Sequence, residues 1–266
     1  MEILDLIGYA GALLIGISLG LIGGGGSILT VPVLVYILAV NPVTATAYSL
    51  FVVGNSSLVG AMQKMKKKLV DFRTATVFAI PAFIAVYGTR KFLVPAIPEH
   101  IFSLGGFTVT RNIGIMLFFA VIMVVAAISM IRNNGKELHS ETEVKYNYPL
   151  IILEGMVVGV LTGIVGAGGG FLIIPALVLL AKLPMKKAVA TSLLIIAVKS
   201  LIGFIGDVQN LEMDWKFLLS FTGVSVLGIF VGDYLNRFIN GQKLKTGFGW
   251  FVLAMGIYIV LKELFK

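Results

Sequence analysis

Cysteine is absent from the 266-residue sequence, and charged side chains are scarce. Without a thiol, the chain forms no disulfide, no thiolate metal site and no cysteine nucleophile. Only 13% of the residues are charged, about half the share found in soluble domains. Apolar residues make up 58%. So little polar surface cannot coat a water-soluble globule, and we therefore predict an all-α polytopic membrane protein.

Several catalytic patterns are missing from the sequence as well. It contains no Ser/His/Asp grouping, no His-Glu-x-x-His and no Walker sequence. We therefore expect neither an enzyme nor an ATPase, and we predict no cofactor and no metal ion. Lys and Arg number 21 against 13 Asp and Glu. In a membrane protein this excess indicates cytoplasmic loops beside anionic lipid, and we expect no nucleic-acid partner.

What the sequence does contain is an internal duplication. After a shift of 143 positions, residues 20–78 align with residues 163–221 without a gap. The matches include Gly20 with Gly163, Pro32 with Pro175, Ser49 with Ser192 and Asp71 with Asp214. An ordered set of Gly, Pro, Ser and Asp matches does not arise from apolar composition alone. We predict a first membrane repeat at 1–131, a cytoplasmic linker at 132–147 and a second repeat at 148–266.

Each half contains five apolar stretches. They lie at 3–22, 28–40, 43–62, 74–92 and 112–131 in the first half, and at 148–165, 171–182, 186–206, 216–236 and 246–263 in the second. A helix needs about 20 residues to span a bilayer. The second stretch of each half is too short for this, and a glycine run separates it from the first stretch.

Loop charges predict how the two halves are oriented. The loop after the third stretch carries Lys64, Lys66, Lys67, Lys68 and Arg73 in the first half, whereas Asp207, Glu212 and Asp214 occupy it in the second. Positive loops stay in the cytoplasm, which places these two loops on opposite sides of the membrane. The fold predicted is thus two inverted repeats, as in many secondary transporters. Lys262 and Lys266 fit this scheme less well, because it places them outside.

The glycine runs are the main candidate site. They comprise Gly23, Gly24, Gly25, Gly26 and the adjacent Ser27 in the first half, and Gly166, Gly168, Gly169 and Gly170 in the second. Irregular backbone at membrane depth is tolerated where it lines a cavity or is buried in protein. Paired breaks predict a substrate site at the repeat interface near the midplane, where helix N-termini favour an anion. The alternative is that these glycines only allow close helix packing.

Polar residues in the third stretch of each half extend this candidate site. Ser192 and Lys199 share one helix face in the second half, since they lie seven residues apart. In the first half, Ser49, Asn55 and Ser56 occupy the corresponding region. Hydroxyls, an amide and one ammonium group make a suitable lining for an oxyanion. An ionisable residue within the membrane is a functional candidate by default.

Other charged residues leave alternatives open. Lys199 could instead form an ion pair with Glu154 or extend its ammonium group to the membrane surface. Glu154 is also a candidate for proton coupling. Asp233 and Arg237 are four residues apart and are interpreted as an interfacial pair. Asp71 and Asp214 are expected to cap helices.

Two longer motifs resemble the sulfite exporter TauE/SafE family. They are Gly20-Leu-Ile-Gly-Gly-Gly-Gly-Ser-Ile-Leu-Thr-Val-Pro32 and Gly163-Ile-Val-Gly-Ala-Gly-Gly-Gly-Phe-Leu-Ile-Ile-Pro175, followed by Ala188–Leu193 and Gly203–Gly206. The resemblance covers essentially the whole chain. It implies a multi-pass permease of the inner membrane that exports sulfite, organosulfonates or related sulfur oxyanions. Lys199 is not carried over from the family and rests on the physical argument alone.

Together these observations predict a secondary transporter of small anions. Its partners would be a small anionic substrate and the lipid bilayer, and a homo-oligomer is left open. Two alternatives remain on the same scaffold: an anion channel, and an importer of another small carboxylate or oxyanion. A membrane-embedded enzyme or a sensor without flux is a further alternative.

Overall fold

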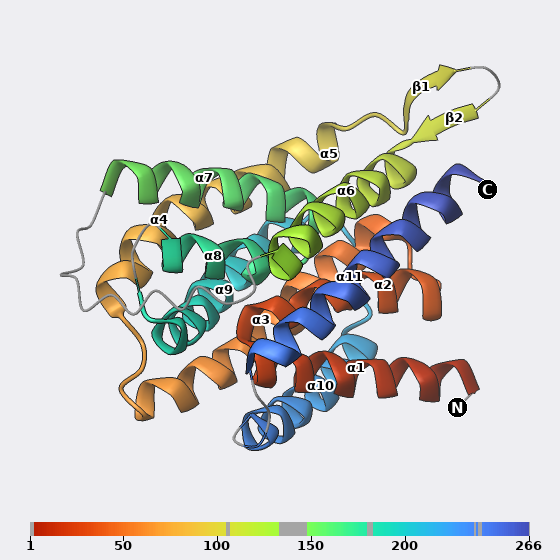
Figure 1. Cartoon of the computed structure of the whole chain (residues 1–266). Coiled ribbons are helices and arrows are strands. Elements are labelled where there is room, and N and C mark those ends of the chain that lie inside the picture. Colours follow the sequence, from red (N-terminus) through yellow and green to blue (C-terminus); the bar gives the residue numbers. More distant parts are fainter. Residues whose placement is uncertain are drawn as a thin grey trace.

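The computed structural model describes residues 3–104, 107–132, 148–179, 183–236, 238 and 241–265. This part of the chain is almost wholly helical (Figure 1). Six of its helical segments are long and apolar enough to cross a membrane: Leu6–Ile37, Pro42–Lys66, Phe72–Ala96, Arg111–Ser129, Met185–Val208 and Trp215–Leu235. The predicted all-α, multi-pass membrane class is confirmed.

The elements follow the predicted stretches closely. The first half consists of α1 (Ile3–Ile22), η1 (Gly23–Leu29), α2 (Thr30–Pro32), η2 (Val33–Ile37), α3 (Pro42–Lys66), α4 (Phe72–Gly88), η3 (Thr89–Leu93), α5 (Val94–Ala96) and α6 (Arg111–Arg132). The second half consists of α7 (Tyr148–Val165), α8 (Gly170–Leu179), α9 (Met185–Val208), α10 (Trp215–Leu235) and α11 (Gly241–Leu264). Most of the linker predicted at 132–147 lies outside the described residues.

One element was not predicted from the sequence. Between α5 and α6, β1 (His100–Leu104) and β2 (Phe107–Thr110) pair as an antiparallel hairpin that projects from the helices (Figure 1). These strands are too short to give a membrane-length apolar run, which is the signal used to locate the other elements.

The first glycine run reverses the chain direction. Gly23 has a φ of 74°, a left-handed conformation that glycine adopts at little steric cost. The segment after it then runs back along α1, with Val33 against Gly11 and Leu38 against Gly8. The second apolar stretch therefore returns toward the end where α1 begins, in agreement with its short length.

Three of the described helices, α3, α4 and α10, have a side-chain cap at the N-terminus. Asp71 Oδ1 accepts a hydrogen bond from Thr74 N at 2.8 Å, and Asp214 Oδ1 accepts one from Phe217 N at 3.0 Å. The capping role predicted for both aspartates is confirmed. Asn41 caps α3 in the same way, through Val43 N at 3.0 Å.

The two halves interleave, because helices of one half pack mainly on helices of the other. α1 packs on α10, α4 on α7, α3 on α9 and α6 on α11 (Figure 1). Glycines allow the closest of these approaches: Gly16 lies against Gly228 and Gly20 against Gly232, so the α1 and α10 backbones nearly touch. The core of the protein is therefore built across the repeat boundary.

Candidate functional site

The two glycine breaks meet inside the molecule. Gly24 and Gly170 lie backbone against backbone, and a Cβ on Gly170 would overlap the main chain of Gly24. Beside them, a Cβ on Gly168 would lie 3.1 Å from Ser27 Cβ. The sequence predicted one site at these two runs, and the structure places the runs in direct contact.

Apolar side chains and the hydroxyl of Ser18, which lies against Gly26, enclose the first break. Gly23 to Ser27 are all buried, with Val189 against Gly23 and Ile196 against Gly24. Ser27 Oγ donates a hydrogen bond to the carbonyl oxygen of Gly24 at 2.7 Å. The first break is thus lined by apolar and hydroxyl side chains.

The second break has polar neighbours instead. Gly166, Gly168 and Gly169 all have positive φ, between 65° and 74°. Gly166 lies directly against Thr46, and Gly169 lies against Thr162 and the ammonium group of Lys199. A Cβ on Gly169 would lie 2.8 Å from Lys199 Nζ. The cation predicted in α9 therefore stands at the backbone of the second break.

Lys199 is completely buried, with 0% of its surface exposed. Its Nζ donates a hydrogen bond to Thr162 Oγ1 at 2.7 Å. Thr162 Oγ1 in turn donates to the carbonyl oxygen of Val158 at 2.7 Å, which orients the hydroxyl. Thr162 was not predicted as a site residue, because a threonine in an apolar helix usually bonds only to its own backbone.

Two alternative interpretations of Lys199 are wrong. Its full burial excludes extension of the ammonium group to the membrane surface. Glu154 is half-buried on α7, eight residues before Thr162, which is about 12 Å along a helix. Among the described residues, Glu154 and Lys199 form no ion pair.

The other predicted polar residues have different roles. Ser56 Oγ donates to Ser225 Oγ at 2.9 Å, toward α10. Asn55 and Ser192 donate to backbone carbonyls of their own helices. Ser49 Oγ is buried and has no hydrogen-bond partner within the described chain. Among these four residues, Ser49 is thus the one whose side chain makes no hydrogen bond within the described chain.

A buried arginine, missed at the sequence level, approaches the second break from another direction. Arg90 lies in η3 with 0% exposure, and its Nη1 donates to Thr46 Oγ1 at 2.9 Å. Asp207 Oδ2 is 3.5 Å from the same nitrogen. Asp207 was interpreted as a loop charge, but it lies within α9 and is buried. Both residues stand near the ends of apolar stretches, where charges normally reach water.

A second ion pair corrects another expectation. Asp233 bonds to Lys64 and, at 2.8 Å, to Lys67, both at the end of α3. Its main partners therefore lie on another helix and not four residues away on its own. Arg237, the partner predicted for it, lies outside the described residues.

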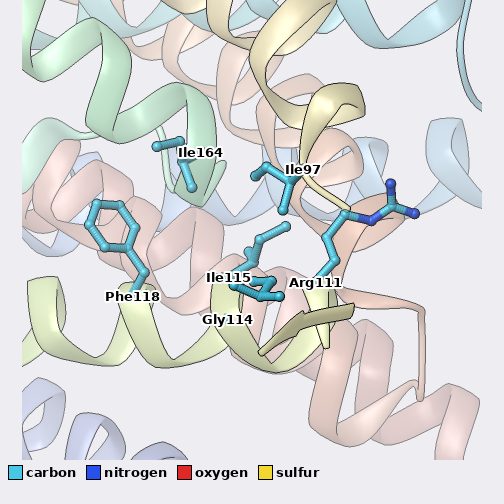
Figure 2. A pocket seen from close by; sticks show the side chains of 7 residues that line it. Ile97, Arg111, Gly114, Ile115, Phe118 and Ile164 are labelled. Atoms are coloured by element: carbon cyan, nitrogen blue, oxygen red, sulfur yellow. The ribbon is translucent and has the colours of Figure 1, made fainter. Parts of the chain in front are cut away.

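Two cavities adjoin near the start of α6. One, of about 190 Å³, is lined by Arg111 and by Ile97, Ile101, Gly114, Ile115, Phe118 and Ile164. In Figure 2 the guanidinium group of Arg111 points away from the apolar side chains of this cavity. The other, of about 150 Å³, is lined by Arg111, Asp207 and Asn210 together with Val43, Val94, Pro95 and Leu211. Arg111 is therefore shared by an apolar cavity and a polar one.

Comparison with known proteins gives consistent matches over nearly the whole chain. The family model "Sulfite exporter TauE/SafE" matches residues 9–259. A "Probable membrane transporter protein" of Xylella fastidiosa is 29% identical over 257 residues, covering 94% of this chain and 92% of that protein. The "Probable membrane transporter protein YunE" of Bacillus subtilis is 29% identical over 256 residues, covering 91% and 89%. No solved structure gives a significant match. The chain therefore belongs to the sulfite exporter TauE/SafE family of membrane transporters.

Proposed function

We propose that this transporter is a secondary exporter of a small oxyanion, in the class of sulfite, organosulfonates and related sulfur oxyanions. The observation that carries the proposal is Lys199, a fully buried ammonium group at the backbone of the second glycine break. A charge within the membrane is costly and is retained where it binds substrate. Among the described residues its partner is a neutral hydroxyl, so an anion is the counter-charge that this position lacks.

Backbone dipoles support the choice of an anion. Helix α8 starts at Gly170, the last glycine of the second break. The N-terminus of a helix carries a partial positive charge and N–H groups without intrahelical acceptors. This end of α8 and the Lys199 ammonium group favour the same sign of ligand at the same place.

Helix directions support the inverted repeat. The equivalent helices α3 and α9 run antiparallel, since Gly54 lies against Leu201 whereas the later Gly60 lies against the earlier Leu193. A two-fold axis in the membrane plane relates equivalent helices in this way. We propose that the two halves rock about the glycine breaks to expose the anion to each side in turn.

Flux measurements test the proposal. The purified full chain in proteoliposomes should move labelled sulfite or ethanesulfonate, with saturation and with a rate that depends on the pH gradient or the membrane potential. Absence of flux for every small oxyanion tried would refute the proposal. Large unitary currents in planar bilayers would establish the anion channel in its place, and accumulation on the inner side only would establish an importer.

Glu154 is our candidate for the proton-coupling group. It is half-buried on α7, the helix that also carries Thr162. Glu154→Gln should abolish the stimulation of flux by a pH gradient and leave anion exchange at equal pH unchanged, because the anion site stays intact. A variant that still responds to the gradient would remove Glu154 from this role.

A further inference from the structure

Arg90 has donors that no protein group uses. A guanidinium group carries five N–H donors. Nη1 bonds to Thr46, whereas Nε and Nη2 are buried without an acceptor among the described residues. Nε and Nη2 lie on one edge of the group, the edge that binds two oxygens of an oxyanion side by side. A buried polar group without a partner needs an explanation, and a ligand is one.

The carboxylate beside Arg90 is loosely held. Asp207 Oδ2 is 3.5 Å from Arg90 Nη1 and makes no hydrogen bond within the described chain. Charge-assisted hydrogen bonds are shorter, about 2.7–2.9 Å. Asp207 also lines the cavity of about 150 Å³ that contains Arg111 and Asn210. Asp207 therefore lies between this cavity and Arg90, whose Nε and Nη2 donors have no acceptor within the described chain.

The backbone around Arg90 is unusual too. Thr89–Leu93 forms a π-helical turn at the end of α4. Such turns are rare and occur frequently at functional sites.

We infer that Arg90 is a second anion-binding residue, which holds an oxyanion through Nε and Nη2 while Asp207 swings away. This inference rests on the proposed transport of oxyanions. It adds a second binding site for the anion, between the cavity lined by Asp207 and Lys199. Arg90 reaches the second break through Thr46, which lies against Gly166. The ligand class is a small anion with two oxygens on one atom, such as sulfite, a sulfonate or a carboxylate. Chloride offers no such pair.

The repeat supplies a matched control. The shift of 143 positions carries Arg90 to Asp233 and Asp207 to Lys64, so the equivalent ion pair has its signs reversed. The packing obeys the same shift, since Gly20 against Gly232 corresponds to Gly163 against Thr89. Asp233 is bound by two lysines and its side chain is 13% exposed, so it is neutralised and in contact with solvent. It is therefore not expected to affect an anion site.

The test is calorimetric titration of the full chain in detergent with sodium sulfite and with sodium ethanesulfonate. Asp207→Asn removes the competing charge and should tighten binding of both by about fivefold or more, as expected for coupled charged sites. Asp233→Asn makes the same chemical change at the equivalent position and should leave both affinities unchanged. An Asp207→Asn protein that binds no more tightly, or an Asp233→Asn protein that tightens equally, would overturn the inference.

A second set of variants tests the donor geometry. Arg90→Lys keeps the charge but loses the two-donor edge, and should weaken ethanesulfonate binding without changing chloride binding. Arg90→Gln leaves Asp207 buried without its cation and is liable to misfold. The double variant Arg90→Gln/Asp207→Asn removes both charges and should lose the gain that Asp207→Asn alone produces. A double variant as tight as Asp207→Asn would show that Arg90 does not bind the anion.

The outcomes separate this inference from the proposed function. A wild-type protein that binds no oxyanion overturns both. A wild-type protein that binds oxyanions, and loses binding on substitution of Lys199 but not of Arg90, overturns this inference and leaves the proposed function standing.

Discussion

The two glycine breaks occupy equivalent positions in the repeat and differ in the side chains around them. Each lies between two helical segments and packs against the other break, but the first contains one glycine with positive φ, Gly23, and the second contains three. Equivalent neighbours differ in character: Lys199 corresponds to Ser56, Thr162 to Leu19, Thr46 to Val189 and Arg90 to Asp233. Buried cations therefore gather near the second break, whereas apolar side chains and the Ser18 hydroxyl surround the first.

This difference indicates a division of labour within the duplicated fold. The first break supplies shape, because its backbone lies against Gly170 and leaves no room for a side chain there. The second supplies charge, through the buried Lys199 and the arginine beyond Thr46. In the proposed rocking motion, both halves move around the same site. One polar site could then face each side of the membrane in turn.

The largest effect is expected at Lys199. Lys199→Gln should weaken oxyanion binding by about 100-fold, the upper range for loss of a hydrogen bond to a charged group. Ser56→Ala, at the equivalent position of the first half, should change affinity little. Calorimetric titration of both variants makes the comparison direct. Similar losses in the two variants would contradict the asymmetry of the breaks, and Lys199→Arg should retain part of the binding.

The next effect concerns the contact between the breaks. Gly170→Ala places a Cβ into the main chain of Gly24, and such overpacking costs about 1–3 kcal/mol. Gly25→Ala is the control, because its Cβ would approach only Ile22, at 3.1 Å. Thermal unfolding in detergent should show a clear loss for the first variant and a smaller one for the second. Equal stabilities would mean that the two breaks do not touch.

The smallest effect is expected at Thr162. Thr162→Val keeps the shape but removes the oxygen that accepts from Lys199 Nζ at 2.7 Å. A hydrogen bond to a charged group is worth about 1.5 kcal/mol at the low end, so anion affinity should fall by about tenfold. Thr222→Val removes a hydroxyl with the same backbone bond on α10, to the carbonyl of Leu218, and should have no effect on affinity. An equal change in affinity in both variants would show that the hydrogen bond from Lys199 to Thr162 does not contribute to anion binding.

Helix positions were predictable because the bilayer imposes a length and a composition on any segment that crosses it. The third stretch of the first half was predicted at 43–62 and forms α3, Pro42–Lys66. Its ends extend further because Asn41 caps the start and lysines continue the helix into the polar region. The β1–β2 hairpin escaped prediction because nothing in its composition distinguishes it from a loop of the same length.

Only part of the candidate site could be predicted from the sequence. Lys199 stood out because it interrupts an apolar stretch, and the breaks stood out because glycine runs are poor helix interiors. Arg90 and Asp207 did not, because charges near the ends of a stretch are normal in membrane helices. Their burial depends on the contact of η3, which continues α4, with α9, a helix from the other half.

By itself, the sequence determined the membrane class, the duplication, the approximate helix positions and the family, since these depend on local composition and on residue order. The tertiary structure alone decided that the breaks touch and that Lys199 bonds to Thr162 and not to Glu154. It also decided that Arg90 is buried beside Asp207. The physical reason is that each of these contacts joins helices distant in the sequence, and their mutual placement comes from close packing across the two interleaved halves.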